Sequence, residues 1–197
     1  MKLVVATPSP FARKARIALL EKQLPHEILV QNPWQTRIEV NPLGKVPALL
    51  LDDGRVVHDS SVIVEYLETL GAPPVLIPAD PALRVAHKQV EAIADGICDA
   101  VVLIVTERAR PAPKQSADWI ARQAGKIPAA LASLEKDIEA FPAYGLAHIA
   151  AGCALGYLDL RYPELDWRAL YPRLRALAAR LGERAAFAAT VPTAQQI

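Results

Sequence analysis

Residues 41–70 read NPLGKVPALLLDDGRVVHDSSVIVEYLETL and contain the clearest secondary-structure signals of the chain. Two short apolar runs, 48–51 and 56–58, flank an Asp-Gly pair, which predicts a β-hairpin because the turn needs a residue that accepts a positive φ. The Asp-Ser-Ser that follows offers side chains that cap a helix, and apolar residues then recur at helical spacing until Gly71. The stretch therefore predicts a hairpin that leads directly into a capped helix.

The chain before the hairpin predicts a strand, a helix and a second strand, over residues 3–6, 11–22 and 26–30. Such a unit is expected to pair its two strands in parallel. Residues 34–40 fit either a short helix or an irregular loop. The charged side chains of the predicted helix are expected to face mainly solvent: Arg13, Lys14, Arg16, Glu21 and Lys22.

A proline-rich segment over residues 72–81 predicts a boundary between two domains, which we expect to span residues 1–77 and 83–197. No strand pattern follows the boundary, so the second domain is predicted to be all-helical. Its expected helices cover residues 82–108, 119–141, 146–160 and 172–182. Pro128 should kink or split the second of these helices. The third is nearly all apolar and should be the buried centre of a bundle.

The composition is that of a globular protein: 52% of the 197 residues are apolar and 22% are charged. The formal net charge of +1 gives no overall field that favours nucleic acid or a membrane surface. No apolar run reaches the ~18–20 residues of a membrane-spanning helix, and the N-terminus is not typical of a secretory signal. Cys98 and Cys153 stand far apart, and no histidine or cysteine shows metal-ligand spacing. We expect a cytoplasmic protein without disulfides or metal.

Ser9 is the first candidate for chemistry because it stands where the first strand runs into the first helix. There its hydroxyl lies beside free backbone N–H groups and the positive end of the helix dipole, which together stabilise a negatively charged sulfur. A hydrogen bond to a charged group contributes roughly 1.5–3 kcal/mol, enough to bring a thiol pKa from ~8.5 to near 7. On the residues alone, Thr7 and Ser9 as ordinary helix caps are the simpler interpretation.

Two further places offer polar groups to a ligand. An X-Pro bond such as Val46–Pro47 can be cis and turn the valine backbone outward for pairing with an extended peptide, although a trans bond is commoner. Asp59 and Ser60 suit the ammonium and carboxylate of an α-amino acid, or simply cap the next helix. Lys45 suits a carboxylate or faces solvent.

NPLGKVPALLLDDG at 41–54, followed by VHDSSVIVEYL at 57–67, resembles the N-terminal domain of the soluble glutathione transferases. Ser-Pro-Phe at 9–11 and RKARI at 13–17 strengthen the likeness, which continues more loosely over the C-terminal helices. The resemblance implies a thioredoxin-like α/β N-terminal domain, an all-helical C-terminal bundle, and a serine-type bacterial member of the family.

The resemblance also implies a role for each candidate residue. Ser9, with Thr7 in reserve, would donate a hydrogen bond to the glutathione thiolate. The Val46–Pro47 bond would be cis, with the valine pairing with the cysteinyl part of glutathione. The implied site is therefore catalytic Ser9 with glutathione-binding Lys45, Val46, Pro47, Asp59 and Ser60, in which the Asp-Ser pair holds the γ-glutamyl end and the lysine suits the glycine carboxylate.

The implied activity is conjugation of the glutathione thiolate to a small hydrophobic electrophile by a homodimer, with glutathione as co-substrate. Residues 94–104 would form the apolar wall for the electrophile, with Asp99, Tyr157 and Tyr162 as candidate neighbours. Glutathione-dependent reduction or isomerisation and a non-catalytic binding or regulatory role stay open. The absence of a cysteine at position 9 argues against disulfide exchange through an enzyme thiol.

The helix expected to begin near residue 146 departs from the family's pattern. Such helices usually open with Ser/Thr-x-x-Asp, whereas this chain has Gly145 and His148 at those places. Loss of the reciprocal side-chain hydrogen bonds is expected to lower the stability of the helix by about 1 kcal/mol. Without them, the sequence does not fix the register of the helix.

Overall fold

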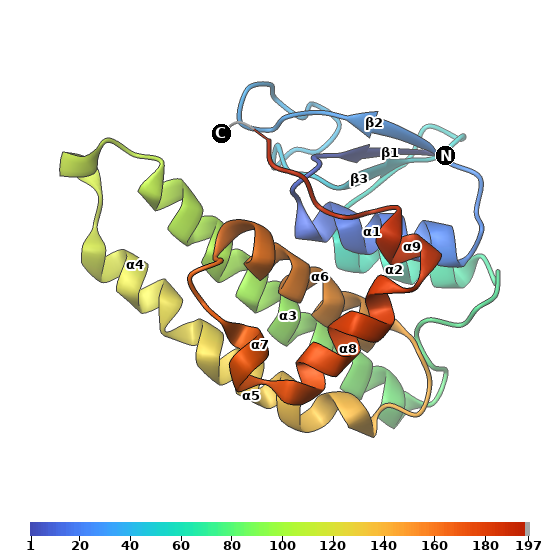
Figure 1. Ribbon diagram of the computed structural model, residues 1–197. Helices are drawn as coiled ribbons and strands as arrows, with labels where there is room; N and C mark the ends of the chain where they lie inside the picture. Colours follow the sequence, from blue (N-terminus) through green and yellow to red (C-terminus); the bar gives the residue numbers. More distant parts are fainter. Residues whose placement is uncertain (196–197) are drawn as a thin grey trace.

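The structure is a computed structural model that describes residues 1–195 of the chain. Figure 1 shows a small sheet covered on one face by two helices, which in turn pack against a larger helical bundle. The first part contains β1 (Lys2–Val5), α1 (Pro10–Glu21), β2 (Glu27–Val30), β3 (Ala48–Leu50), β4 (Val56–Val57) and α2 (Ser60–Thr69). The bundle contains α3 (Pro81–Arg108), α4 (Ala117–Ala124), α5 (Lys126–Asp137), α6 (Leu146–Arg161), α7 (Trp167–Leu170), α8 (Pro172–Gly182) and α9 (Ala185–Ala188), with 3-10 turns at Ala112–Lys114 and Ile138–Ala140.

This architecture confirms the predicted fold, a thioredoxin-like α/β domain followed by an all-helical domain. The domain limits at residues 77 and 83 stay predictions, and residues 196–197, at the end of the predicted second domain, lie outside the described residues. Among residues 1–195, no helix has both the length and the apolar run needed to cross a bilayer.

The sheet has the order β2-β1-β3-β4, with β1 parallel to β2 and the other two pairs antiparallel. Successive residues of β1 point to opposite faces. Leu3 and Val5 belong to the main core with α1 and α2, whereas Val4 packs with Ile38 and Ala48. The segment after β2 is an irregular loop, and the fully buried Ile38 anchors it to this second cluster.

The helix predicted over residues 119–141 is split, because α4 and α5 meet at Gly125. Pro128 lies in the first turn of α5, where a backbone N–H has no intrahelical partner and its loss costs little. Ser116 caps α4 as its position suggests, since its Oγ accepts a hydrogen bond from the amide of Trp119 at 3.2 Å. The sequence patterns did not predict the single turn α7, which begins after Asp166.

As predicted, α6 is the buried centre of the bundle, and it packs against both α1 and α3. Its small residues permit this close packing. At Gly152, a Cβ atom would lie 2.6 Å from side-chain atoms of both Leu181 and Phe187. Because neighbouring elements contact α6 on several sides, its residues have to be apolar, and those at the closest contacts have to be small.

The expectation that the charged side chains of α1 face solvent is wrong for Arg13, Lys14 and Lys22, which are buried. The reason is that α1 lies between the sheet and the bundle, so both of its sides are covered (Figure 1). The Arg13 guanidinium lies over the ring of Phe187, 5.2 Å from its centroid, and donates to the carbonyl of Phe187 at 3.3 Å. Arg16, which is half-buried, donates to the carbonyl of Ala189.

Lys14 joins α1 to α3 through an ion cluster in which Lys14 and Glu91 are buried and Asp95 is partly exposed. Its side chain is 1% exposed, and Nζ lies 2.8 Å from Oε1 of Glu91 and 2.6 Å from Oδ2 of Asp95. Burial alone would lower the pKa of Lys14, but the two carboxylates outweigh burial and hold the pKa above its usual value. Glu91 also pairs with Lys88 at 2.6 Å. The cluster therefore ties the first domain to the first helix of the bundle with paired charges.

We expect Lys14→Met to lower the free energy of unfolding by about 3–5 kcal/mol, because it removes the cation that the buried Glu91 shares with Asp95, and Lys88 pairs only with Glu91. Lys2→Met is the matched control: its ion pair with Glu27 is 55% and 56% exposed, so its loss should cost no more than about 1 kcal/mol. Urea unfolding of the two variants measures both values. Equal, small losses would contradict a structural role for the cluster.

The start of α6 is capped by groups from other elements in place of the missing side-chain pair. The amide of Leu146 donates to the carbonyl of Leu76 at 2.8 Å, and the amide of Ala147 donates to Nδ1 of His87 at 3.2 Å. A Cβ at Gly145 would lie 2.5 Å from the Leu76 oxygen, so the serine or threonine of the family's pattern does not fit here. The expected loss of capping is therefore offset, and the helix begins at residue 146 as predicted.

This cap should make stability depend on pH. His87 can accept a hydrogen bond at Nδ1 only as neutral imidazole, and burial lowers its pKa below the usual value. Because the folded pKa is depressed, the stabilisation is fully present above the unfolded pKa of ~6.5 and is lost as the pH falls through the folded value. We expect His87→Ala to cost about 1–3 kcal/mol at neutral pH and this difference from wild type to shrink in acid. Unfolding at a series of pH values measures the difference, and one independent of pH would exclude the imidazole as acceptor.

Candidate functional site

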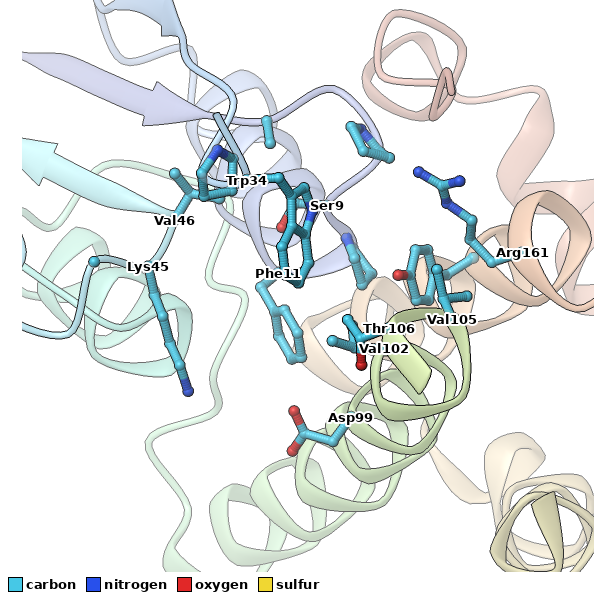
Figure 2. Close-up of a pocket in the computed structure, with 16 residues that line it drawn as sticks. Ser9, Phe11, Trp34, Lys45, Val46, Asp99, Val102, Val105, Thr106 and Arg161 are labelled. Atoms are coloured by element: carbon cyan, nitrogen blue, oxygen red, sulfur yellow. The ribbon is translucent and has the colours of Figure 1, made fainter. Parts of the chain in front are cut away.

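A cavity of about 340 Å³ lies where the loops after β1 and β2 meet α3 and α6. Most of its lining is apolar. Its charged lining side chains are Lys45, Asp99 and Arg161, and its hydroxyl groups come from Ser9, Thr106 and Tyr157. In Figure 2, Lys45 and Arg161 lie on opposite sides of Ser9, and Asp99 lies toward the side of the cavity away from Arg161. The cavity is therefore apolar in its middle and charged at both ends.

Ser9 is the N-cap of α1 and faces this cavity. Its Oγ accepts a hydrogen bond from the amide of Ala12 at 3.1 Å, and among residues 1–195 its hydroxyl proton has no acceptor. The amide of Phe11 also makes no hydrogen bond within that part of the chain. The Ser9 oxygen accepts the capping hydrogen bond through a lone pair, and its O–H group can still donate to a ligand. Capping the helix and binding a ligand are therefore compatible roles.

Lys45 and Val46 reach the cavity from a turn that Asn41 holds in place. The Asn41 side chain is buried, accepts a hydrogen bond from the amide of Leu43 at 2.9 Å, and donates to the carbonyl of Lys45 at 2.9 Å. Gly44 has a φ of +63°, a conformation that glycine adopts without strain. The sequence Asn-Pro-Leu-Gly therefore aims the two following residues at the cavity.

The Val46–Pro47 peptide bond is cis. Pro47 is buried and does not line the cavity, whereas Val46 does. Within residues 1–195 neither the amide nitrogen nor the carbonyl oxygen of Val46 has a hydrogen-bond partner. Both polar groups of its backbone are therefore free to pair with a ligand.

Asp59 and Ser60 begin α2 and do not line the cavity. Burial pushes the pKa of Asp59 up, but hydrogen bonds from the hydroxyl and amide of Ser61 outweigh it and hold the pKa below its usual value. Ser60 is 2% exposed. The pKa of Asp99 is raised by burial and by the charge of Asp59, and Lys45 opposes this rise. Asp59 therefore lies close enough to influence the Asp99 end of the cavity.

The structure separates the predicted site residues into two groups: Ser9, Lys45 and Val46 line the cavity, and Pro47, Asp59 and Ser60 do not. The reserve candidate Thr7 does not line it either, because its hydroxyl donates to the carbonyl of Thr193 at 3.2 Å.

Among the predicted neighbours, Asp99 and Tyr157 line the cavity, whereas Tyr162 lies under the guanidinium of Arg108. The wall that α3 provides includes Val102, as expected from residues 94–104, and extends one turn further to Thr106.

Trp34 and Arg161 are among the lining residues that the sequence patterns did not single out. Trp34 follows β2 and Ser9 follows β1, so both lie at the carboxyl edge of the same parallel pair, where ligands commonly bind. Arg161 stands four residues after Tyr157, on the same face of α6. The position after a strand could therefore have indicated Trp34, and the helical spacing from Tyr157 could have indicated Arg161.

Cys98 and Cys153 are free and buried inside the bundle. Burial raises the pKa of both thiols, to about 11 for Cys153. Such thiols are unreactive because the thiolate is the nucleophilic form. Within residues 1–195, no group of three or more histidine, cysteine or acidic side chains is placed to hold a metal ion.

Two family models match the chain in succession. The model described as "Glutathione S-transferase, N-terminal domain" matches residues 8–70, and the model described as "Glutathione S-transferase, C-terminal domain" matches residues 117–180. The uncharacterized GST-like protein YibF of Escherichia coli is 40% identical over 199 residues, which cover 98% of this chain and 98% of that protein. The chain belongs to the glutathione S-transferase family.

Solved structures of other glutathione S-transferases share the whole fold. The enzyme from Methylobacterium radiotolerans, in complex with glutathione sulfonate, has a TM-score of 0.95 and 46% identity over 100% of this chain and 96% of its own. The enzyme from Methylobacillus flagellatus, with glutathione bound, has a TM-score of 0.93 and 38% identity over 98% of this chain and 99% of its own. As a member of this family, the chain has the two-domain arrangement implied by its sequence.

Proposed function

We propose that the protein is a glutathione transferase of the serine type, which binds glutathione in the cavity beside Ser9 and conjugates its sulfur to a small electrophile. The single observation that carries the proposal is the Ser9 hydroxyl at the N-terminus of α1, with its proton unused within residues 1–195. The solved relatives that hold glutathione or its sulfonate support the choice of ligand.

In this mechanism Ser9 donates a hydrogen bond to the thiolate and is not itself the nucleophile. The free amide of Phe11 and the positive end of the α1 dipole stabilise the same negative charge. Together they favour the ionised thiol at neutral pH. The sulfur then forms a bond to the electrophilic carbon, and the leaving group departs with its electron pair.

The remaining groups hold the peptide part of glutathione. The free backbone of Val46 pairs with the cysteinyl residue as an added strand would, while Pro47 restricts the chain that follows. Lys45 pairs with the glycine carboxylate. Asp59 and Ser60 receive the γ-glutamyl end, and Asp99 adds a second carboxylate on that side, where an ammonium group is stabilised.

A reductase that uses an enzyme thiol is disfavoured, because Cys98 and Cys153 are both buried and both have raised pKa values. The lining of the cavity is mostly apolar, which favours a site for a hydrophobic second substrate over simple glutathione binding. We further propose, from the family resemblance, that the protein is a cytoplasmic homodimer.

We expect Ser9→Ala to raise the pKa of bound glutathione by about 1–2 units and to lower turnover about 10–100-fold, because a hydrogen bond to a charged group contributes roughly 1.5–3 kcal/mol. Ultraviolet absorbance of the thiolate during a pH titration, and initial rates with an aryl halide, measure the two effects. Ser9→Thr keeps both the hydroxyl and the helix cap and should retain most of the activity.

Thr7→Ala is the matched control, because it removes a nearby hydroxyl that points to Thr193. It should leave thiolate absorbance and turnover close to wild type. A wild-type protein that shows no affinity for glutathione by calorimetry would instead favour a non-catalytic member of the family. Normal turnover in Ser9→Ala would remove the serine from the mechanism.

A further inference from the structure

The charge of Arg161 has no counterpart in the site described so far. Its Nε is buried and makes no hydrogen bond within residues 1–195, and one Nη donates to the carbonyl of Gln195 at 3.3 Å. The acidic residues nearest to it in sequence are engaged elsewhere: Asp159 pairs with Arg168, and Glu164 pairs with Arg108. Within that part of the chain Arg161 forms no ion pair.

Tyr157 adds a second donor beside this guanidinium. It stands one turn earlier on the same face of α6, lines the cavity, and makes no hydrogen bond through its hydroxyl within the described residues. Burial raises the pKa of Tyr157 to about 12, although the charge of Arg161 opposes the rise, so the phenol stays protonated and can donate. Two side chains thus present several N–H and O–H groups to the cavity and no acceptor of matching charge.

A guanidinium with an unpaired, buried Nε facing an apolar cavity is costly unless a ligand supplies an anion. Its position in the last turn of α6 lessens that cost, because a cation is favoured at the C-terminal end of a helix. The planar fork of arginine matches the two oxygens of a carboxylate. The opposite end of the cavity carries Asp99, whose negative charge disfavours a second anion there.

We propose that Arg161 and Tyr157 form a subsite for a carboxylate carried by the electrophilic substrate, so that the preferred second substrates are organic acids. The inference rests on the proposed function. Figure 2 shows Lys45 and Arg161 on opposite sides of Ser9. In this proposal, glutathione occupies the Lys45 side, the carboxylate of the electrophile binds Arg161, and the electrophilic carbon lies between them near the sulfur. Arg161 is then a specificity-determining residue for the second substrate.

The test compares two conjugates of glutathione that differ only in charge. S-(2-carboxyethyl)glutathione and its carboxamide have the same length, and the pair with one more methylene group checks the reach of the subsite. Calorimetry gives the dissociation constant of each conjugate, and of glutathione itself, for wild type and variants. The wild type should bind the acid about 10–100-fold more tightly than the amide, because each charged hydrogen bond contributes roughly 1.5–3 kcal/mol.

We expect the ratio of the amide's dissociation constant to the acid's to fall close to one in Arg161→Gln. In Arg161→Lys, which keeps the charge but not the planar fork, the ratio should take an intermediate value. Tyr157→Phe should reduce the preference by a smaller factor. Arg175→Gln removes an exposed charge from α8 and is the matched control, for which the wild-type preference is expected.

Three results would overturn the proposal. A wild type without preference for the acid would mean that no carboxylate subsite exists. Equal weakening of acid and amide in Arg161→Gln would assign Arg161 only the structural task of holding the Gln195 carbonyl. Weakening of glutathione itself by the same factor would place Arg161 in the glutathione site. A wild type that does not bind glutathione at all is a distinct outcome, which would contradict both the proposed function and this inference.

Discussion

The attachment of α1 to α3 through the buried amine of Lys14 is the interaction on which the site depends. Ser9 stands at the start of α1, and the far wall of the cavity belongs to α3, so the distance between donor and wall is set by how these two helices are joined. Glu91, Asp95 and Asp99 recur every four residues on one face of α3. Lys14 pairs with the first two, Lys88 also pairs with Glu91, and the third lines the cavity.

This arrangement gives the buried charges a positional role. An apolar contact at the same place would tolerate sliding of one helix along the other, whereas an amine held between two carboxylates fixes a single register. Arg13 adds a second attachment, from α1 to the backbone of Phe187. The loop that carries Ser9 thus leads into a helix that is fixed at two points to the other domain.

Much of the fold could be predicted because its signals are local. The hairpin and the capped α2 follow from residues 41–70, and the buried α6 follows from an apolar pattern that is continuous around the helix. The error on α1 has a physical cause. A single chain shows which residues are charged but not how many sides of a helix are covered, so Lys14 and Lys22 were assigned to solvent.

The site was predictable to a different degree at each position. Ser9 could be proposed from the sequence because a helix N-terminus marks it. The spacing from Tyr157 could have placed Arg161 on the same face of α6, but only the structure shows that its Nε has no partner among residues 1–195. The order of the loops along the sheet edge would have found Trp34, since it depends only on topology. Residues that act through long-range contacts, such as His87, carry no local pattern at all.

The cap of α6 ties the formation of the central helix to distant parts of the chain. Its first two amides donate hydrogen bonds to the carbonyl of Leu76, in the connection between the domains, and to the imidazole of His87, on α3. The segment therefore lacks a start signal of its own and becomes a stable helix only when these acceptors, roughly 60–70 residues earlier, have been brought into place. Assembly of the bundle is thus coupled to docking of the interdomain connection, and the two domains should fold as one cooperative unit.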